Sequence, residues 1–145
     1  MDNTFTLISR VDGEVRRFIA EELAKEGITA IVPSHGAIII ELMKHGTLAM
    51  SELAHNIDRT PQTVTCLVKK LVASGYVTTG RAEGDSRVTV AALTDQGRKL
   101  AGTLCEISEK IYEIQYEGIS EEEVRALRSG LKKMYANFAD RGDGA

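Results

Sequence analysis

The chain has 145 residues, of which 43% are hydrophobic and 27% charged, and its formal net charge is −3. This size and composition are typical of one globular domain and argue against a fibrous or disordered chain. Two cysteines, Cys66 and Cys105, are too few for a disulfide framework. Charged residues interrupt any signal-peptide core, and no apolar run is long enough to cross a bilayer, so we expect a cytoplasmic protein without a membrane partner.

Positive charge is concentrated in the middle of the chain. Residues 59–87 hold 5 basic and 2 acidic side chains, whereas residues 1–58 hold 5 basic and 9 acidic ones and residues 88–145 hold 8 and 10. Local charge decides how one face of a protein meets DNA, so the middle segment is a candidate nucleic-acid surface despite the acidic total.

Three helices are predicted before residue 60. Apolar residues at helical spacing predict a helix over 5–25, with Gly27 as its stop. A second helix opens at Pro33 and Ser34 and ends at Gly46, and a short third helix covers about 50–56. The second helix is expected to turn four apolar side chains inward: Ile38, Ile39, Leu42 and Met43.

A fourth helix over 61–74 has two distinct faces. Thr60 suits its N-cap, Pro61 its first position and Gly75 its stop. The core-facing residues are Val64, Leu67, Val68, Leu71 and Val72. The opposite face carries Gln62, Thr63, Cys66, Lys69 and Lys70. With the third helix it forms a helix-turn-helix pattern, and its N-terminal polar residues are placed to read base edges, with the lysines nearer the phosphates. The alternative is a solvated amphipathic helix.

A β-hairpin is predicted over 76–93. Valines and threonines run up to a turn at residues 83–86 and then resume, and Arg81 and Arg87 flank that turn.

Two further helices follow the hairpin. Thr94 caps a fifth helix that reaches about Glu117, and Gly118 breaks it. Ser120 and Glu123 form a capping box for a sixth helix, and the tail over 140–145 is expected to fray.

The middle of the chain resembles a known family. The stretch LAMSELAHNIDRTPQTVTCLVKKLVASGYV, followed by RAEGDSRVTVAALTDQG, is similar to the winged helix-turn-helix core of the MarR family of bacterial regulators. The matching features are Glu52-Leu53-Ala54, Thr63-Val64-Thr65, Leu71, Gly75, Asp85-x-Arg87 and Leu93-Thr94-x-x-Gly97. The ordered series with these spacings is specific.

This resemblance implies a mainly α fold with a small β-hairpin wing. The chain would be a single MarR-like domain over 1–145, with the winged helix-turn-helix core at 34–93 and terminal dimerisation helices at 1–30 and 95–140. In this family an arginine of the wing enters the minor groove, and the matching residue is Arg87. We expect Asp85 to pair with a nearby arginine and organise the wing. The alternative is an exposed hairpin with incidental charges.

Four positions depart from the family pattern. Family members often have basic side chains where this chain has Thr79, Ser86 and Cys66, and usually a capping residue where it has Ala49. These changes remove phosphate contacts but leave the helix-turn-helix and Arg87 in place.

The terminal helices carry heptad-like apolar seams. One comprises Leu100, Leu104, Ile107, Ile111 and Ile114, and the other Val124, Leu127, Leu131, Met134 and Phe138. Such seams suit side-by-side helix packing. They predict packing within the chain or with a second copy, and the resemblance implies a homodimer.

Other residue clusters suggest little chemistry. His35, His45 and His55 lie in different elements without metal-ligand spacing, so neither a metal site nor a cofactor is expected. Cys66 is a candidate redox thiol, with a small tolerated residue as the plainer interpretation. Tyr112 and Tyr116 are candidates for an inducer pocket between the dimerisation helices and the winged core, with interface packing as the alternative.

We therefore predict a dimeric, sequence-specific DNA-binding transcriptional regulator and not an enzyme. Recognition helix 61–74 would lie in the major groove of a pseudo-palindromic operator and wing 76–93 in its minor groove. The predicted DNA contacts are Thr60, Gln62, Thr63, Cys66, Lys69, Lys70, Arg81 and Arg87. The resemblance implies a repressor released by a small molecule or an oxidant. The alternative function is a winged-helix protein-interaction module that binds no DNA.

Overall fold

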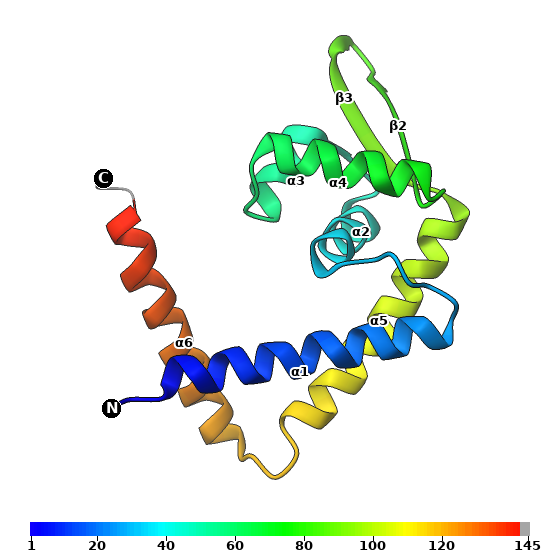
Figure 1. Cartoon of the computed structure of the whole chain (residues 1–145). Helices are drawn as coiled ribbons and strands as arrows, with labels where there is room; N and C mark the ends of the chain where they lie inside the picture. The colour runs from blue at the N-terminus through cyan, green and yellow to red at the C-terminus, as the bar shows by residue number, and fades with distance from the viewer. Residues whose placement is uncertain (143–145) are drawn as a thin grey trace. The chain divides into compact units, whose positions relative to one another are not determined.

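The structure, a computed structural model, describes residues 1–142, which form six helices and three strands (Figure 1). The helices are α1 (Thr4–Lys25), α2 (Pro33–His45), α3 (Met50–Asn56), α4 (Pro61–Ala73), α5 (Asp95–Gln115) and α6 (Glu121–Gly142). The strands are β1 (Thr47–Ala49), β2 (Val77–Ala82) and β3 (Asp85–Leu93). The predicted mainly α fold with a small β-hairpin wing is confirmed.

Strand β1 is missing from the sequence-based prediction. It is the edge of a three-stranded antiparallel sheet with the order β1-β3-β2, and its Leu48 lies opposite Ala91 of β3. Three residues are too short to show a β alternation, and this strand exists because β3 supplies its hydrogen-bonding partner. The strand anchors the base of the hairpin to the segment that follows α2.

The apolar core lies in the first of two compact units. Met1–Ser108 form this unit, and the second begins at Glu109. The largest side chains with almost no exposed surface are Leu23, Ile38, Ile39, Leu42, Leu53, Leu71, Leu100 and Val64. Each such side chain contributes about 1.5–3 kcal/mol of burial free energy, so α2, α3, α4 and the start of α5 are held together mainly by apolar packing.

Two expectations about buried side chains are wrong. Met43 of α2 and Val72 of α4 were expected in the core, but they are 42% and 41% exposed, because each lies at the margin of its helix's buried stripe. Leu104 belongs to an apolar seam that was expected to pack within the chain or against a second copy, and it is only 8% exposed, with its methyl groups near Gly36 of α2. Helical spacing identifies an apolar stripe without showing which element covers it.

His35 is a buried polar residue at the start of α2. The residue is 3% exposed, and its Nδ1 accepts a hydrogen bond of 3.1 Å from the backbone N–H of Val32. Burial, together with the positive charge of Lys70 on α4, lowers the pKa of His35. The neutral ring is therefore the form that the folded protein stabilises. Protonation of Nδ1 would remove the acceptor of the hydrogen bond from the Val32 N–H.

We expect acid to destabilise the protein through His35. The unfolded state takes up the imidazole proton near pH 6.5, and the folded state takes it up only at lower pH. Unfolding therefore consumes a proton between the two pKa values, so stability is complete above about pH 6.5 and falls as the pH drops through that window. Melting curves from about pH 8 to pH 5 should show a smaller acid step in His35→Gln. The exposed-residue variant His55→Gln is the control, and an unchanged step in His35→Gln would contradict this assignment.

The sixth helix begins at the predicted capping box and extends further than expected. Ser120 N–H donates to Glu123 Oε2 at 2.9 Å, and Glu123 N–H donates to Ser120 Oγ at 3.2 Å. Fraying was predicted for 140–145, but α6 remains helical to Gly142, and residues 143–145 lie outside the described residues. Among residues 1–142, no helix is long and apolar enough to cross a membrane.

Candidate nucleic-acid interface

Helix α4 begins with a tight polar cap. Thr60 Oγ1 accepts the backbone N–H of Thr63 at 3.2 Å and lies 2.9 Å from the Thr63 hydroxyl oxygen. The turn before it contains Asp58 at φ 54°, in the left-handed region that aspartate tolerates better than most residues. Thr60 and Thr63, both predicted DNA contacts, are therefore also the groups that fix where the helix starts.

The outward face of α4 carries polar and cationic side chains. Gln62, Cys66, Lys69 and Lys70 are exposed, whereas Val64 and the other core-facing residues lie on the opposite side. The thiol of Cys66 is free. The positive charge of Lys70 contributes to lowering the pKa of His35 on α2.

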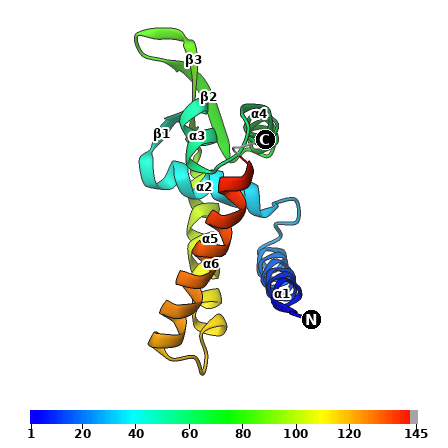
Figure 2. The same ribbon diagram turned by 90° about the vertical axis from the view of Figure 1, so that its left-hand side faces the viewer.

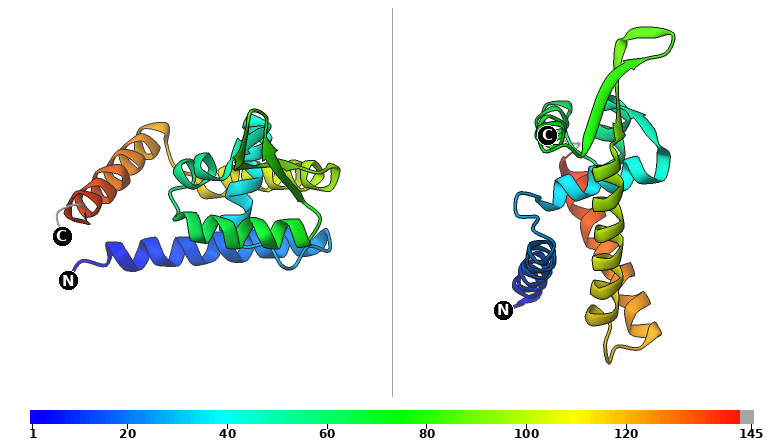
Figure 3. Two further views of the ribbon diagram at one scale, coloured as in Figure 1. Left: turned by 90° about the horizontal axis from the view of Figure 1, so that it is seen from above. Right: turned by 90° about the vertical axis from the view of Figure 1, so that its right-hand side faces the viewer.

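The β2–β3 hairpin projects beyond α2, α3 and α4 (Figure 2; Figure 3, right). Ala82 pairs with Asp85, so the turn consists of Glu83 and Gly84, the latter at φ 82°. The predicted turn over 83–86 is thus two residues too long, because Asp85 and Ser86 already belong to β3. The register shifts between Arg81 and Ala82, which marks an irregularity next to the tip.

Two residues organise one side of the hairpin tip. Asp85 Oδ1 accepts the backbone N–H of Arg87 at 3.0 Å and its Nε–H at 3.2 Å. These bonds, the backbone one first, lower the pKa of Asp85, so its carboxylate is ionised near neutral pH. The Arg87 side chain is nevertheless 90% exposed. Asp85 thus aligns an arginine that remains accessible to an outside partner.

Arg81 is engaged with the neighbouring strand. Its guanidinium donates to the Thr89 hydroxyl at 2.9 Å, and the two residues are direct partners in the sheet. The two arginines that flank the turn therefore differ: Arg81 bonds across the hairpin, whereas Arg87 bonds only within its own strand.

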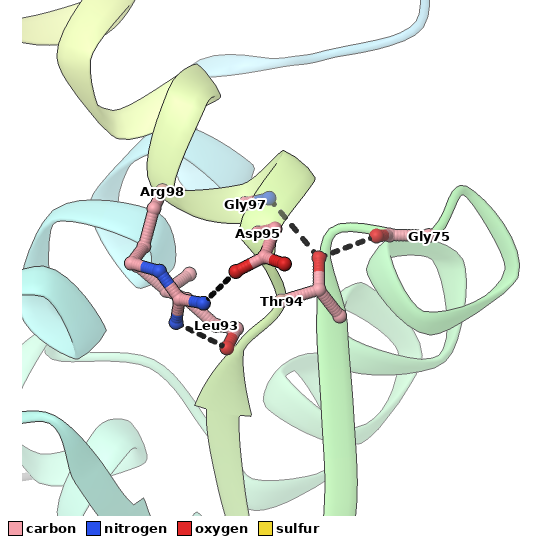
Figure 4. A network of polar contacts seen from close by, with 6 residues as sticks. All are labelled: Gly75, Leu93, Thr94, Asp95, Gly97 and Arg98. Atoms are coloured by element: carbon pink, nitrogen blue, oxygen red, sulfur yellow. Dashed lines mark hydrogen bonds and ion pairs between the residues drawn. The ribbon is translucent and has the colours of Figure 1, made fainter.

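A polar network joins the end of α4 to the start of α5 (Figure 4). Thr94 Oγ1 donates to the carbonyl oxygen of Gly75 at 2.6 Å and accepts the N–H of Gly97 at 3.1 Å. Next to these bonds, Arg98 donates to the Leu93 carbonyl at 3.2 Å and pairs with Asp95. The base of the hairpin is thereby fixed between two helices.

Comparisons with known proteins agree with this geometry. Residues 33–78 match a family described as winged helix-turn-helix DNA-binding. The fold matches the crystal structure of a mutant MarR from E. coli complexed with operator DNA, with a TM-score of 0.76, 21% identity, and coverage of 89% of this chain and 91% of that one. This chain is a winged helix-turn-helix protein with the MarR fold. The resemblance predicted from the sequence is confirmed.

Curated relatives of the MarR-fold chain are named as regulators. It is 31% identical over 94 residues to an uncharacterized HTH-type transcriptional regulator, YfiV, of Bacillus subtilis. The matched region covers 65% of this chain and 59% of that relative. The chain is 25% identical over 137 residues to the HTH-type transcriptional repressor IacR of Pseudomonas putida, covering 94% of this chain and 80% of that one. The chain thus spans less than two thirds of the length of YfiV but most of IacR.

The remaining predicted site residues lie outside the winged core. Tyr112 and Tyr116 belong to the second compact unit, where their rings meet edge to face at 5.1 Å, and Tyr112 is 61% exposed. Within the described part of the MarR-fold chain, no group of three His, Cys, Asp or Glu side chains could hold a metal ion.

Two exposed residues of the helix-turn-helix were not among the predicted contacts. Arg59 immediately precedes the Thr60 cap, and its guanidinium donates to the Asp58 carbonyl at 3.1 Å. Thr65 lies on α4, and its hydroxyl donates to the Pro61 carbonyl at 2.9 Å. Arg59 therefore lies beside the N-terminus of the predicted recognition helix.

Proposed function

We propose that the protein is a dimeric, sequence-specific DNA-binding transcriptional regulator that acts in the cytoplasm. The observation that carries this proposal is the accessible Arg87, 90% exposed on a projecting hairpin, in the same compact unit as the polar and cationic face of α4. Helix α4 enters the major groove and the wing enters the adjacent minor groove. The operator-bound MarR structure of the same fold supports this arrangement.

The residues of α4 make different DNA contacts according to their position along the helix. Gln62 and Cys66 on the outward face approach base edges, and Thr60 and Thr63 contact DNA at the start of the helix. Lys69 and Lys70 lie further along, where ammonium groups neutralise phosphates without reading sequence.

The wing supplies electrostatic recognition. A narrow A·T-rich minor groove concentrates negative potential and attracts a guanidinium. Asp85 holds the backbone and Nε of Arg87 and so presents its terminal nitrogens outward. The Arg81 guanidinium is held by Thr89, and it contacts the DNA backbone nearer the base of the wing.

A second copy of the chain completes the regulator. None of the side chains of α6, within residues 121–142, is buried, and the helix exposes Leu127, Leu131, Met134 and Phe138 along one seam. The N-terminal part of α1 likewise exposes Phe5, Leu7 and Val11. These apolar faces suit packing against another copy, which would place two recognition helices about 10 bp apart on a pseudo-palindromic operator.

The regulator acts as a repressor that a small molecule or an oxidant releases. The relative IacR, named as a repressor, aligns with most of the chain and supports this sign of regulation. The small-molecule inducer contacts Tyr112 and Tyr116 in the second unit.

Binding to duplex DNA as a function of salt tests the proposal. The protein is used to select sequences from a random duplex library, and the selected duplex and a scrambled one are titrated at several salt concentrations. We expect the selected duplex to bind at least about 10³-fold more tightly, with an affinity that falls steeply with salt. Failure to bind any duplex would favour the alternative, a winged-helix module that recognises another protein.

Cys66 provides a test of oxidant release. Hydrogen peroxide converts its thiolate to a sulfenic acid and is itself reduced to water, which adds a polar oxygen on the face of α4 that meets the bases. We expect peroxide to weaken binding of the selected duplex in the wild-type protein and in Cys105→Ser, but not in Cys66→Ser. Wild-type binding that is indifferent to peroxide would mean that a small molecule is the only inducer.

A further inference from the structure

The Thr94 hydroxyl makes two bonds to segments that are far apart in sequence. As an N-cap it accepts the Gly97 N–H in the first turn of α5, which is the ordinary function of a threonine at this position. It also donates its own proton to the carbonyl of Gly75, 19 residues earlier, at 2.6 Å. A cap needs only the acceptor, so the second bond links α5 to another element.

That element is the recognition helix. Helix α4 ends at its C-cap Ser74, and the next residue, Gly75, adopts φ 84°. The Gly75 N–H donates to Val72 and the Tyr76 N–H donates to Leu71, so the Gly75 peptide is held by the last turn of α4. A bond to the Gly75 carbonyl is therefore a bond to the end of α4.

The end of α4 and the start of α5 are in close contact. The Thr94 N–H donates to the Tyr76 carbonyl at 3.0 Å. At Gly97, an added Cβ would lie 2.0 Å from the same carbonyl oxygen, so the first turn of α5 rests directly on the peptide that follows α4. Only glycine fits at this position.

The side chains that α4 itself buries in the core are apolar: Val64, Val68 and Leu71. Apolar packing is non-directional, whereas a hydrogen bond in a half-buried site fixes an angle as well as a distance. We propose that Thr94 is the positioning residue that sets the direction of the recognition helix α4 relative to the first turns of α5. As a statement about operator affinity this rests on the proposed function; as a statement about helix geometry it does not.

Three substitutions distinguish the capping bond from Gly97 from the bond to the Gly75 carbonyl. Thr94→Ser keeps both bonds, Thr94→Val keeps the shape and loses both, and Thr94→Asp keeps an efficient N-cap but has no proton to give Gly75. Thr103→Val is the matched control, because the Thr103 hydroxyl donates only to Lys99 within α5, at 3.3 Å. Melting curves show which of these variants fold.

The first measurement is the distance between spin labels on Cys66 and on Lys99→Cys, in a Cys105→Ser background, with labelled protein diluted in unlabelled protein. The reference is the doubly labelled protein with Thr94 and Thr103 unchanged. We expect a narrow distribution of label distances in the reference, in Thr94→Ser and in Thr103→Val. In Thr94→Asp and Thr94→Val we expect a broadened or shifted distribution. If Thr94→Val does not fold, Thr94→Asp decides. A cooperatively folded Thr94→Asp protein with the reference distribution overturns the proposal, since the cap alone would then suffice.

The second measurement is binding of the selected duplex by unlabelled variants. We expect Thr94→Asp to lose about tenfold in affinity, and Thr94→Ser and Thr103→Val to stay within about twofold of wild type. Thr94→Asp binding like wild type, despite an altered label distance, would overturn the role in DNA binding. A wild-type protein that binds no duplex refutes the proposed function, and the label distances still decide the role of Thr94.

Discussion

Replacing Arg87 with alanine weakens binding to the selected duplex by about 1.5–3 kcal/mol per wing and leaves the melting temperature unchanged. Stability is preserved because the side chain is 90% exposed and bonds only to Asp85 two residues away. Affinity falls because the guanidinium no longer displaces counterions or occupies the focused negative potential of the minor groove. The salt dependence should flatten by about one unit per wing.

Two companion variants make this result specific. Arg87→Lys keeps the charge and should keep the salt slope while losing part of the affinity. Gln62→Ala on α4 should relax discrimination at one base position per half-site by about 1–3 kcal/mol with little change in slope. Titrations against the selected and scrambled duplexes at several salt concentrations measure all three. If Arg87→Ala binds the selected duplex with wild-type affinity, the hairpin is not part of the DNA interface.

Replacing Leu131 with glutamate should convert the protein from dimer to monomer at micromolar concentration. Leu131 is 40% exposed in the single chain, so the change costs the monomer little. At an interface between copies it would leave a buried carboxylate without a partner, which costs about 3–5 kcal/mol for each copy. Sedimentation velocity measures the change in mass.

Ser129→Glu is the control for this experiment. It adds the same carboxylate to an exposed position on the face of α6 away from the seam, so the dimer should persist. Leu104→Glu is unsuitable, because Leu104 is buried in the first unit and its loss would unfold the winged core. A Leu131→Glu protein that remains dimeric would place the interface on another face.

Local signals predicted the bounds of several helices well, because start and stop residues mark their ends. Thr60, Pro61 and Gly75 delimit α4 to within a residue of the structure, and Ser120 with Glu123 marks the start of α6. Strand β1 had no such signal, since its existence depends on pairing with β3.

The candidate site was only partly predictable. Helical spacing separates the two faces of α4, and the family resemblance indicated Arg87 and Asp85 as candidates. Spacing cannot show which element covers an apolar stripe, so it could not show that Leu104 is buried within the first unit. The bond from Thr94 to Gly75 was also inaccessible, because it depends on two segments meeting in space.

The short reach of β1 along the sheet has an evolutionary consequence. Strand β1 pairs with β3 only from Val90 to Ala92, so the outer part of the hairpin consists of two strands alone. Between Thr78 and Val90 no side chain is buried, and substitutions there make few demands on the core. Mutation can therefore change the length and charge of the tip without disturbing the packing of the helices, and in the proposed regulator such a change would alter the target site.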